Sequence, residues 1–187
     1  MKYKIDKHRL WSSPDRKEWV MCAFSGPDDK LSEQDTDNIE LKVSNGVLNA
    51  LGQVVYYQQG QVNDGAHFII GEDGECVQHQ EPIKRTKGNH STDTIIIELI
   101  NPGPLHLDVN GVWRTWWGDP VENDWIRSND NNVGWVCCES KQIHSLLELV
   151  AVLRRHYNID TTKFLDSDCM ILDPHVEKII NNQQWLK

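Results

Sequence analysis

The sequence predicts an α/β fold: a single domain with a central mixed β-sheet flanked by helices. Residues 94–100 are mostly apolar and β-branched, as in a central strand covered on both faces. Apolar side chains recur at helical spacing between residues 140 and 157, which is typical of a helix packed on such a sheet. The chain has 187 residues, the length of one ordinary domain, so we predict one unit over 1–187.

The first half of the chain supplies the early elements. Residues 1–36 are polar and form an N-terminal extension in this interpretation. Residues 39–43 alternate apolar and polar side chains, which predicts a half-buried strand. Apolar residues between 46 and 59 share one helical face, so a helix is predicted there.

A hairpin follows this helix. Strands are predicted over 66–70 and 76–78, with a turn between them in which Gly74 adopts a positive φ without steric cost. The strand at 94–100 comes next, and Asn-Pro-Gly-Pro at 101–104 ends it sharply.

The second half begins with a Trp-rich insertion over 105–139, for which we expect little regular structure. Ser140 is the expected cap of the following helix. A short last strand beginning at 164–165 and a closing helix over 176–182 complete the prediction.

Composition and charge exclude several classes of partner. The net charge is −9, which argues against nucleic acid or an anionic membrane as the main partner. The N-terminus has no apolar segment typical of a signal peptide, so we expect a soluble protein made in the cytoplasm. The five cysteines contain no Cys-x-x-Cys pair, which argues against a structural zinc knuckle. Cys137 and Cys138 are either a redox pair or small residues at a strand or loop edge.

Segments in a particular order resemble a known family over nearly the whole chain. They are 6–10 (Asp-Lys-His-Arg-Leu), 66–70 (Ala-His-Phe-Ile-Ile) followed by Asp73, Gly74 and Gln78, 97–103 (Ile-Glu-Leu-Ile-Asn-Pro-Gly), 111–118 with Trp116 and Trp117, and 134–135 (Gly-Trp) followed by Gln142 and the helix to Tyr157. Together they resemble the N-acetylmuramoyl-L-alanine amidases of the peptidoglycan-recognition type, in particular the longer phage and prophage forms. The resemblance implies an amidase-like fold with a groove that includes His67, Asn101, Trp116 and Trp117.

Enzymes of this family hydrolyse the amide between muramic acid and L-alanine with a zinc ion, which polarises the carbonyl and activates water. The resemblance implies two histidines and an Asp or Cys as ligands. The corresponding positions here hold Lys42, Asp166 and Asp173, and the lysine that assists the third ligand is replaced by Ile171. Because lysine is protonated at neutral pH and repels a cation, we expect no zinc at this position. Zinc remains the alternative cofactor.

We expect Lys42 to replace the metal, with its ammonium close to Asp166 and Asp173. The alternative is that the Lys42 side chain extends to solvent. Glu98 matches a family glutamate that helps activate water in some members, and here it is either a retained base or a structural carboxylate. A rearranged metal site that combines His175 with the aspartates is the remaining possibility.

Other candidate residues have competing interpretations. His67 is expected to be a hydrogen-bonded core residue rather than a ligand. Trp116 and Trp117 either stack on a sugar or partner, or pack within their loop.

Three functions are therefore open. The first is a non-catalytic amidase-like protein that binds a peptidoglycan fragment or a protein partner in the inherited groove. The second is an active amidase with a rearranged metal site. The third is a phage or prophage interaction or regulatory protein that reuses the fold. Whether the chain is an enzyme stays uncertain at this point.

Overall fold

The structure is a computed structural model, which describes residues 3–6, 9–12, 18–19, 36–44, 46, 49–59, 65–83, 93–128, 133–159 and 161–163. Its centre is a five-stranded sheet in the order β12-β4-β7-β5-β6. The strands are β4 (Asn38–Val43), β5 (Phe68–Ile70), β6 (Cys76–Gln78), β7 (Thr94–Leu99) and β12 (Thr161–Lys163). Only β6 is antiparallel to its neighbour, so the predicted mixed sheet is confirmed.

The central position of β7 follows from its composition. All six of its residues are buried, and it pairs in parallel with β4 on one side and β5 on the other. β4 is also almost fully buried, so the prediction of a half-buried strand there is wrong. Continuous apolar sequence of this kind is typical of parallel strands covered on both faces.

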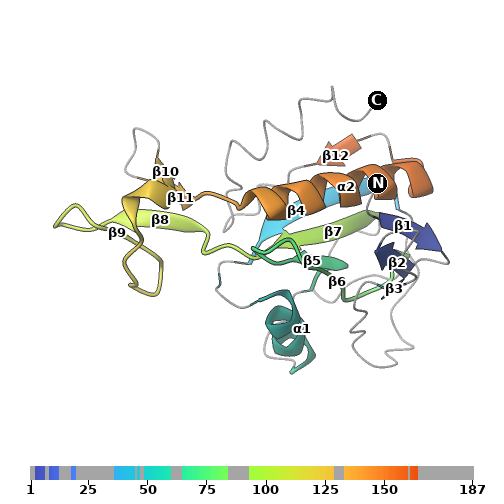
Figure 1. Ribbon diagram of the computed structural model, residues 1–187, viewed down its shortest axis with the longest axis horizontal. Helices are drawn as coiled ribbons and strands as arrows, with labels where there is room; N and C mark the ends of the chain where they lie inside the picture. The colour runs from blue at the N-terminus through green and yellow to red at the C-terminus, as the bar shows by residue number, and fades with distance from the viewer. Residues whose placement is uncertain are drawn as a thin grey trace.

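Two helices cover the two faces of this sheet. Figure 1 shows α2 on one side and α1 on the other. α1 (Ala50–Gln58) begins after Asn49, whose side chain accepts a hydrogen bond from the Gly52 amide at 2.7 Å. This cap makes the helix shorter than the predicted range 46–59. In α2 (Ser140–Tyr157) the N-cap position is Glu139 and not Ser140 as predicted, and the Glu139 side chain makes no capping hydrogen bond. The helix ends at Asn158, which has a φ of 57°.

Alternate residues of β7 contribute to two separate cores. Ile95, Ile97 and Leu99 belong to the larger cluster, which includes the buried face of α2. Ile96 belongs to a smaller cluster with Ala50 and Val54 of α1. Because side chains alternate along a strand, Glu98 is directed to the α1 side.

The hairpin β5–β6 is fixed against α2 by its turn. Gly74 has a φ of 80°, and a Cβ there would lie 2.6 Å from the Lys141 carbonyl oxygen. Ser145 of α2 donates a hydrogen bond to the Gly74 carbonyl at 2.7 Å. Glycine is therefore required at this position both for its φ and for the close approach of α2.

The Trp-rich segment contains a second sheet, so the expectation of little regular structure was wrong. β8 (Pro104–Leu107), β9 (Trp113–Arg114), β10 (Ile126–Ser128) and β11 (Val133–Val136) form an antiparallel sheet in the order β10-β11-β8-β9, with the short helix η1 (Asn123–Trp125) before β10. Gly134 permits the sheet to pack tightly, because a Cβ there would lie 3.0 Å from the Trp113 ring.

The N-terminal segment forms a third sheet, which is antiparallel and consists of β1 (Tyr3–Asp6), β2 (Arg9–Ser12) and β3 (Glu18–Trp19). The segment 6–10, which is part of the family resemblance, contains the end of β1 and the beginning of β2. Tyr3 and Leu10 are buried in the α2-side core, and the Leu10 amide donates to Gln78 Oε1 at 2.8 Å.

Two predicted elements, the strand from 164–165 and the helix over 176–182, lie outside the described residues. Within the described part of the chain, neither helix has the length and apolar character that crossing a membrane would require.

Candidate functional site

A buried ion pair joins the two central strands. Lys42 and Glu98 are direct partners in the parallel register of β4 and β7, so their side chains leave the sheet on the same face. Lys42 Nζ lies 3.6 Å from Glu98 Oε2, and the two side chains are 7% and 1% exposed. Replacing either partner alone would leave an uncompensated charge in the interior.

Two residues of α1 complete the surroundings of Glu98. Gln53 donates a hydrogen bond from Nε2 to Glu98 Oε1 at 3.1 Å. The Tyr57 hydroxyl donates a short hydrogen bond to Glu98 Oε2. Both carboxylate oxygens are therefore bonded to donors of the protein, as a buried carboxylate requires.

Lys42 has further contacts that hold its ammonium inside the protein. It donates to the Gly65 carbonyl at 3.2 Å, and it lies 5.5 Å from the centre of the Tyr57 ring. The alternative in which Lys42 extends to solvent is wrong, because the residue is only 6% exposed.

The other expected members of this cluster, Asp166, Asp173 and His175, lie outside the described residues. The predicted approach of Lys42 to Asp166 and Asp173, and the rearranged metal site with His175, therefore stay predictions.

His79 lies beside this cluster. Its ring stacks on Tyr57 with centroids 5.7 Å apart, and its Nδ1 lies 3.1 Å from the Ala66 carbonyl oxygen. Nδ1 therefore carries the proton, and the buried Nε2 has no hydrogen-bond partner within the described part of the chain. Burial, and secondarily the charge of Lys42, hold the pKa of His79 below its usual range, against the bond to Ala66. The ring is therefore neutral at pH 7.

His67 has a structural position in the sheet. Its backbone donates to Ile96, and its Nδ1 accepts a hydrogen bond from the Ile96 amide at 2.8 Å. The residue is fully buried. The side chain thus extends the pairing of β5 and β7, which agrees with the hydrogen-bonded core residue expected from the sequence.

Asn101 lies two residues after the end of β7, and its side-chain amide makes local hydrogen bonds. Its Oδ1 accepts from the Gly103 amide at 3.0 Å, and its Nδ2 donates to the Val136 carbonyl at 3.1 Å. A weaker contact joins Nδ2 to the Cys138 sulfur at 3.7 Å. Asn101 therefore fixes the end of β7 to the second sheet, and it also lines a cavity with Glu72 and Gln142.

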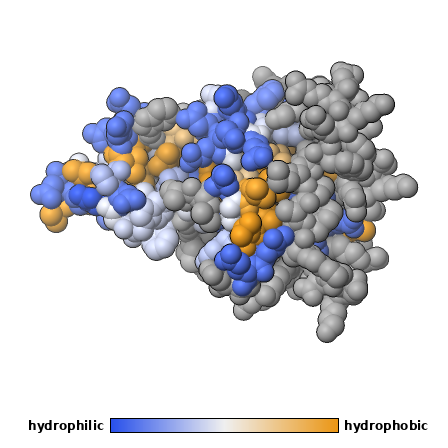
Figure 2. Space-filling view, turned by 60° about the horizontal axis from the view of Figure 1, so that its bottom comes forward, coloured by the Kyte–Doolittle hydropathy of each residue, from blue (hydrophilic) through white to orange (hydrophobic). Residues whose placement is uncertain are grey.

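Trp116 and Trp117 lie at the β9 end of the second sheet. Their rings meet edge to face with centroids 5.4 Å apart, and Trp117 Nε1 donates to Asp119 Oδ2 at 2.6 Å. Trp116 is 68% exposed. Figure 2 shows apolar side chains among hydrophilic ones on the projecting arm that this sheet forms at the left of the view. Trp117 is thus fixed by its neighbours, whereas the side chain of Trp116 is largely exposed.

The zinc ion implied by the resemblance does not fit the described part of the cluster. An ammonium has no lone pair for a metal, and Lys42 is already bonded to Glu98 and Gly65. Over the part of the chain that the structure describes, no three or more His, Cys, Asp or Glu side chains are grouped so as to hold a metal ion.

Sequence reasoning missed the neighbours of Glu98. Gln53 and Tyr57 are four positions apart and therefore share a face of α1. This spacing is the feature of the sequence that could have placed them together. No pattern in the sequence placed His79 or the Gly65 carbonyl at the site.

Comparison with known proteins identifies one family. The sequence profile described as N-acetylmuramoyl-L-alanine amidase matches residues 43–176. No curated protein matches the chain in sequence.

Several solved structures share the fold. The endolysin N-acetylmuramoyl-L-alanine amidase LysCS from Clostridium intestinale URNW superposes with a TM-score of 0.52 at 14% identity, covering 86% of this chain and 95% of that chain. A mutant endolysin from Bacillus subtilis gives 0.53 at 14% identity, over 89% and 94% of the two chains. The PlyG catalytic domain gives 0.54 at 13% identity, over 89% of each. At these identities the likeness concerns the fold.

Proposed function

The chain belongs to the N-acetylmuramoyl-L-alanine amidase family, and from this premise we propose that it is a degenerate, zinc-free and non-catalytic member. In this proposal it binds a peptidoglycan fragment in the inherited groove. The family and the fold shared with endolysin amidases support peptidoglycan as the ligand. A protein partner in the same groove is the alternative occupant.

The observation that carries the proposal is the buried pair of Lys42 and Glu98. Hydrolysis in this family needs a metal with an open position and a carboxylate able to take a proton from water. Here an ammonium occupies a position that the resemblance assigns to a ligand, and the matching carboxylate is bonded to Lys42, Tyr57 and Gln53. Neither group is available for its part in the reaction.

The test combines metal analysis with two assays on insoluble peptidoglycan. The purified protein is incubated with zinc and desalted, and its metal content is measured. Binding is then measured by co-sedimentation, and cleavage by the release of soluble peptide. An endolysin amidase of the family serves as the active control. We expect less than stoichiometric zinc, co-sedimentation, and no release of peptide.

Each result distinguishes between the functions. Stoichiometric zinc together with release of peptide would overturn the proposal in favour of an active amidase. A folded protein that does not sediment with peptidoglycan would favour a protein partner.

Two matched variants test whether Trp116 contributes to the binding of peptidoglycan. Trp116→Ala removes the exposed ring and is expected to weaken co-sedimentation, because aromatic faces stack on sugars. Val109→Ala changes a fully exposed residue of the same sheet region and is expected to leave binding unchanged.

A further inference from the structure

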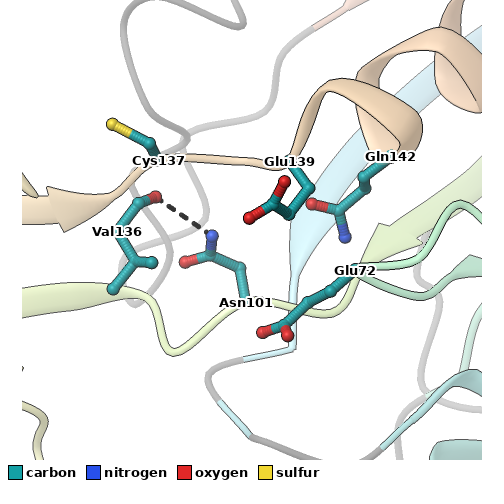
Figure 3. Close-up of a pocket in the computed structure, with 6 residues that line it drawn as sticks. All are labelled: Glu72, Asn101, Val136, Cys137, Glu139 and Gln142. Atoms are coloured by element: carbon teal, nitrogen blue, oxygen red, sulfur yellow. Dashed lines mark hydrogen bonds between the residues drawn. The ribbon is translucent and has the colours of Figure 1, made fainter. Parts of the chain in front are cut away.

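A cavity of about 200 Å³ lies where the turn of the β5–β6 hairpin, the end of β7 and the start of α2 meet. Figure 3 shows the side chains that line it. They are Glu72, Asn101, Val136, Cys137, Glu139 and Gln142. Its volume is far above the roughly 10–15 Å³ that one water molecule needs.

Gln142 presents an unsatisfied acceptor to this cavity. The side chain is fully buried, and its Nε2 donates to the carbonyls of Ile70 at 3.1 Å and Ile100 at 2.9 Å. These two bonds fix the orientation of the amide, because a carbonyl accepts only from the nitrogen. Among the residues that the structure describes, Oε1 has no hydrogen-bond partner, and Figure 3 shows it turned toward Glu139 and Asn101.

The charged groups that line the cavity are also acceptors, and the Asn101 amide is already bonded to Val136 and Gly103. Glu72 and Glu139 contribute carboxylates, and no Lys, Arg or His is among the lining residues. Burial, then the charges of Glu139 and Asp73, raise the pKa of Glu72 above its usual range. The N-terminus of α2 offers about +0.5 charge, which does not balance two carboxylates.

We propose that this cavity binds an aliphatic primary ammonium group, such as the end of a lysine side chain. An ammonium has three N–H donors, and the cavity offers three acceptor groups in Glu72, Glu139 and Gln142 Oε1. The apolar atoms of Val136 and Cys137 would contact the methylene chain.

A bare metal ion fits this cavity less well. Among the described residues, no three acidic, His or Cys side chains are grouped for a metal. The volume would also leave most of the space around an ion unfilled.

The proposed site is separate from the Lys42 cluster. Glu98 is bonded to residues of α1, whereas Gln142 belongs to α2 on the other side of the sheet (Figure 1). The cavity shares Asn101 with the groove that the resemblance implies, but metal content and co-sedimentation test the proposed function separately from the titration of this cavity, so the two failures are distinguishable.

The test uses Nα-acetyl-L-lysine N-methylamide and its norleucine analogue, which lacks the ammonium. Each is titrated into the full chain while the side-chain amide signals of Gln142 and Asn101 are followed by NMR. We expect the lysine derivative to shift the Gln142 signal in a saturable way and the norleucine analogue to leave it in place. Glu72→Gln and Glu139→Gln are each expected to weaken binding about fivefold, as for one charged hydrogen bond partly exposed to solvent.

Glu75→Gln is the matched control, since it removes one charge from the same hairpin at an exposed position that does not line the cavity. It is expected to leave binding within about twofold of the parent, since an exposed charge outside the cavity contributes little. Equal binding of the norleucine analogue, or unchanged binding in both cavity variants, would overturn the proposal. So would displacement of the lysine derivative by an equal concentration of Mg²⁺ or Ca²⁺, which would mark the cavity as a metal site.

Discussion

The ammonium of Lys42 lies 3.6 Å from the carboxylate of Glu98, and both side chains are almost completely buried. In an amidase of this family the resemblance places a zinc ligand at the first position and a water-activating glutamate at the second. The pair therefore joins, in the interior of the protein, two positions that the resemblance assigns to the reaction site.

Lys42→Met is expected to lower the free energy of unfolding by about 3–5 kcal/mol, because it leaves the Glu98 carboxylate buried without its cation. The double variant Lys42→Met with Glu98→Gln should recover most of this loss, since no buried charge remains. Urea denaturation of the two single variants and the double variant at pH 7 gives the coupling energy. A loss below about 1 kcal/mol for Lys42→Met would mean that the pair contributes no more than an exposed one.

His79 is expected to make folding stability sensitive to mild acid. Burial lowers its pKa from the ordinary value of 6.5, so the unfolded chain takes up the proton first as the pH falls. Its contribution is therefore constant above about pH 6.5 and is lost below that value.

The variant His79→Phe retains a ring against Tyr57 but cannot titrate. The free energy of unfolding is measured near neutral pH and near pH 5. We expect its decrease between these two pH values to be smaller for the variant than for the parent. Equal losses in both proteins would show that His79 does not titrate in this range.

Gly74→Ala is expected to destabilise the protein more than Gly111→Ala, although both glycines have nearly the same φ, 80° and 77°. An alanine in this region costs about 1–2 kcal/mol at either site. At Gly74 the new Cβ would also meet the Lys141 carbonyl at 2.6 Å, whereas at Gly111 nothing lies within 4 Å. Overpacking adds about 1–3 kcal/mol. Thermal and urea unfolding measure the loss of stability in each variant. Equal losses in the two variants would contradict the prediction.

Asp108 is expected to keep a low pKa even without its arginine. Its pKa is lowered to about 2 by the Val112 amide first and by the Arg114 side chain second. Arg114→Gln should therefore raise the pKa only part of the way toward the ordinary value of 3.8. A ¹³C NMR titration of the carboxyl group measures this. Because the folded pKa is lowered, the contribution to stability is present above the ordinary value and is lost as the pH falls through about 2.

Much of the central sheet could be predicted from local sequence. The apolar, β-branched composition of β7 and the turn residues between β5 and β6 carry their information within a few positions. The strands of the second sheet are two to four residues long and contain tryptophan, proline and charged residues, so no period could indicate them.

The candidate site was less predictable because it depends on register. The sequence identified Lys42 and Glu98 separately, but their pairing requires knowing that β4 and β7 are parallel neighbours with these residues opposite. The acceptors of the cavity come from a turn and a helix distant in sequence, and no local signal joins Glu72 to Gln142.

The alternation along β7 has a consequence for how this protein can evolve. The large apolar cluster with α2 lies on one face of the strand, and Glu98 with its polar neighbours lies on the other, beside the smaller apolar cluster with α1. The contacts with α2 therefore include neither Glu98 nor its partner Lys42. A substitution at Glu98 that is matched by one at Lys42 leaves no unpaired buried charge and keeps the contacts with α2, so these two positions can change together while the chain still folds.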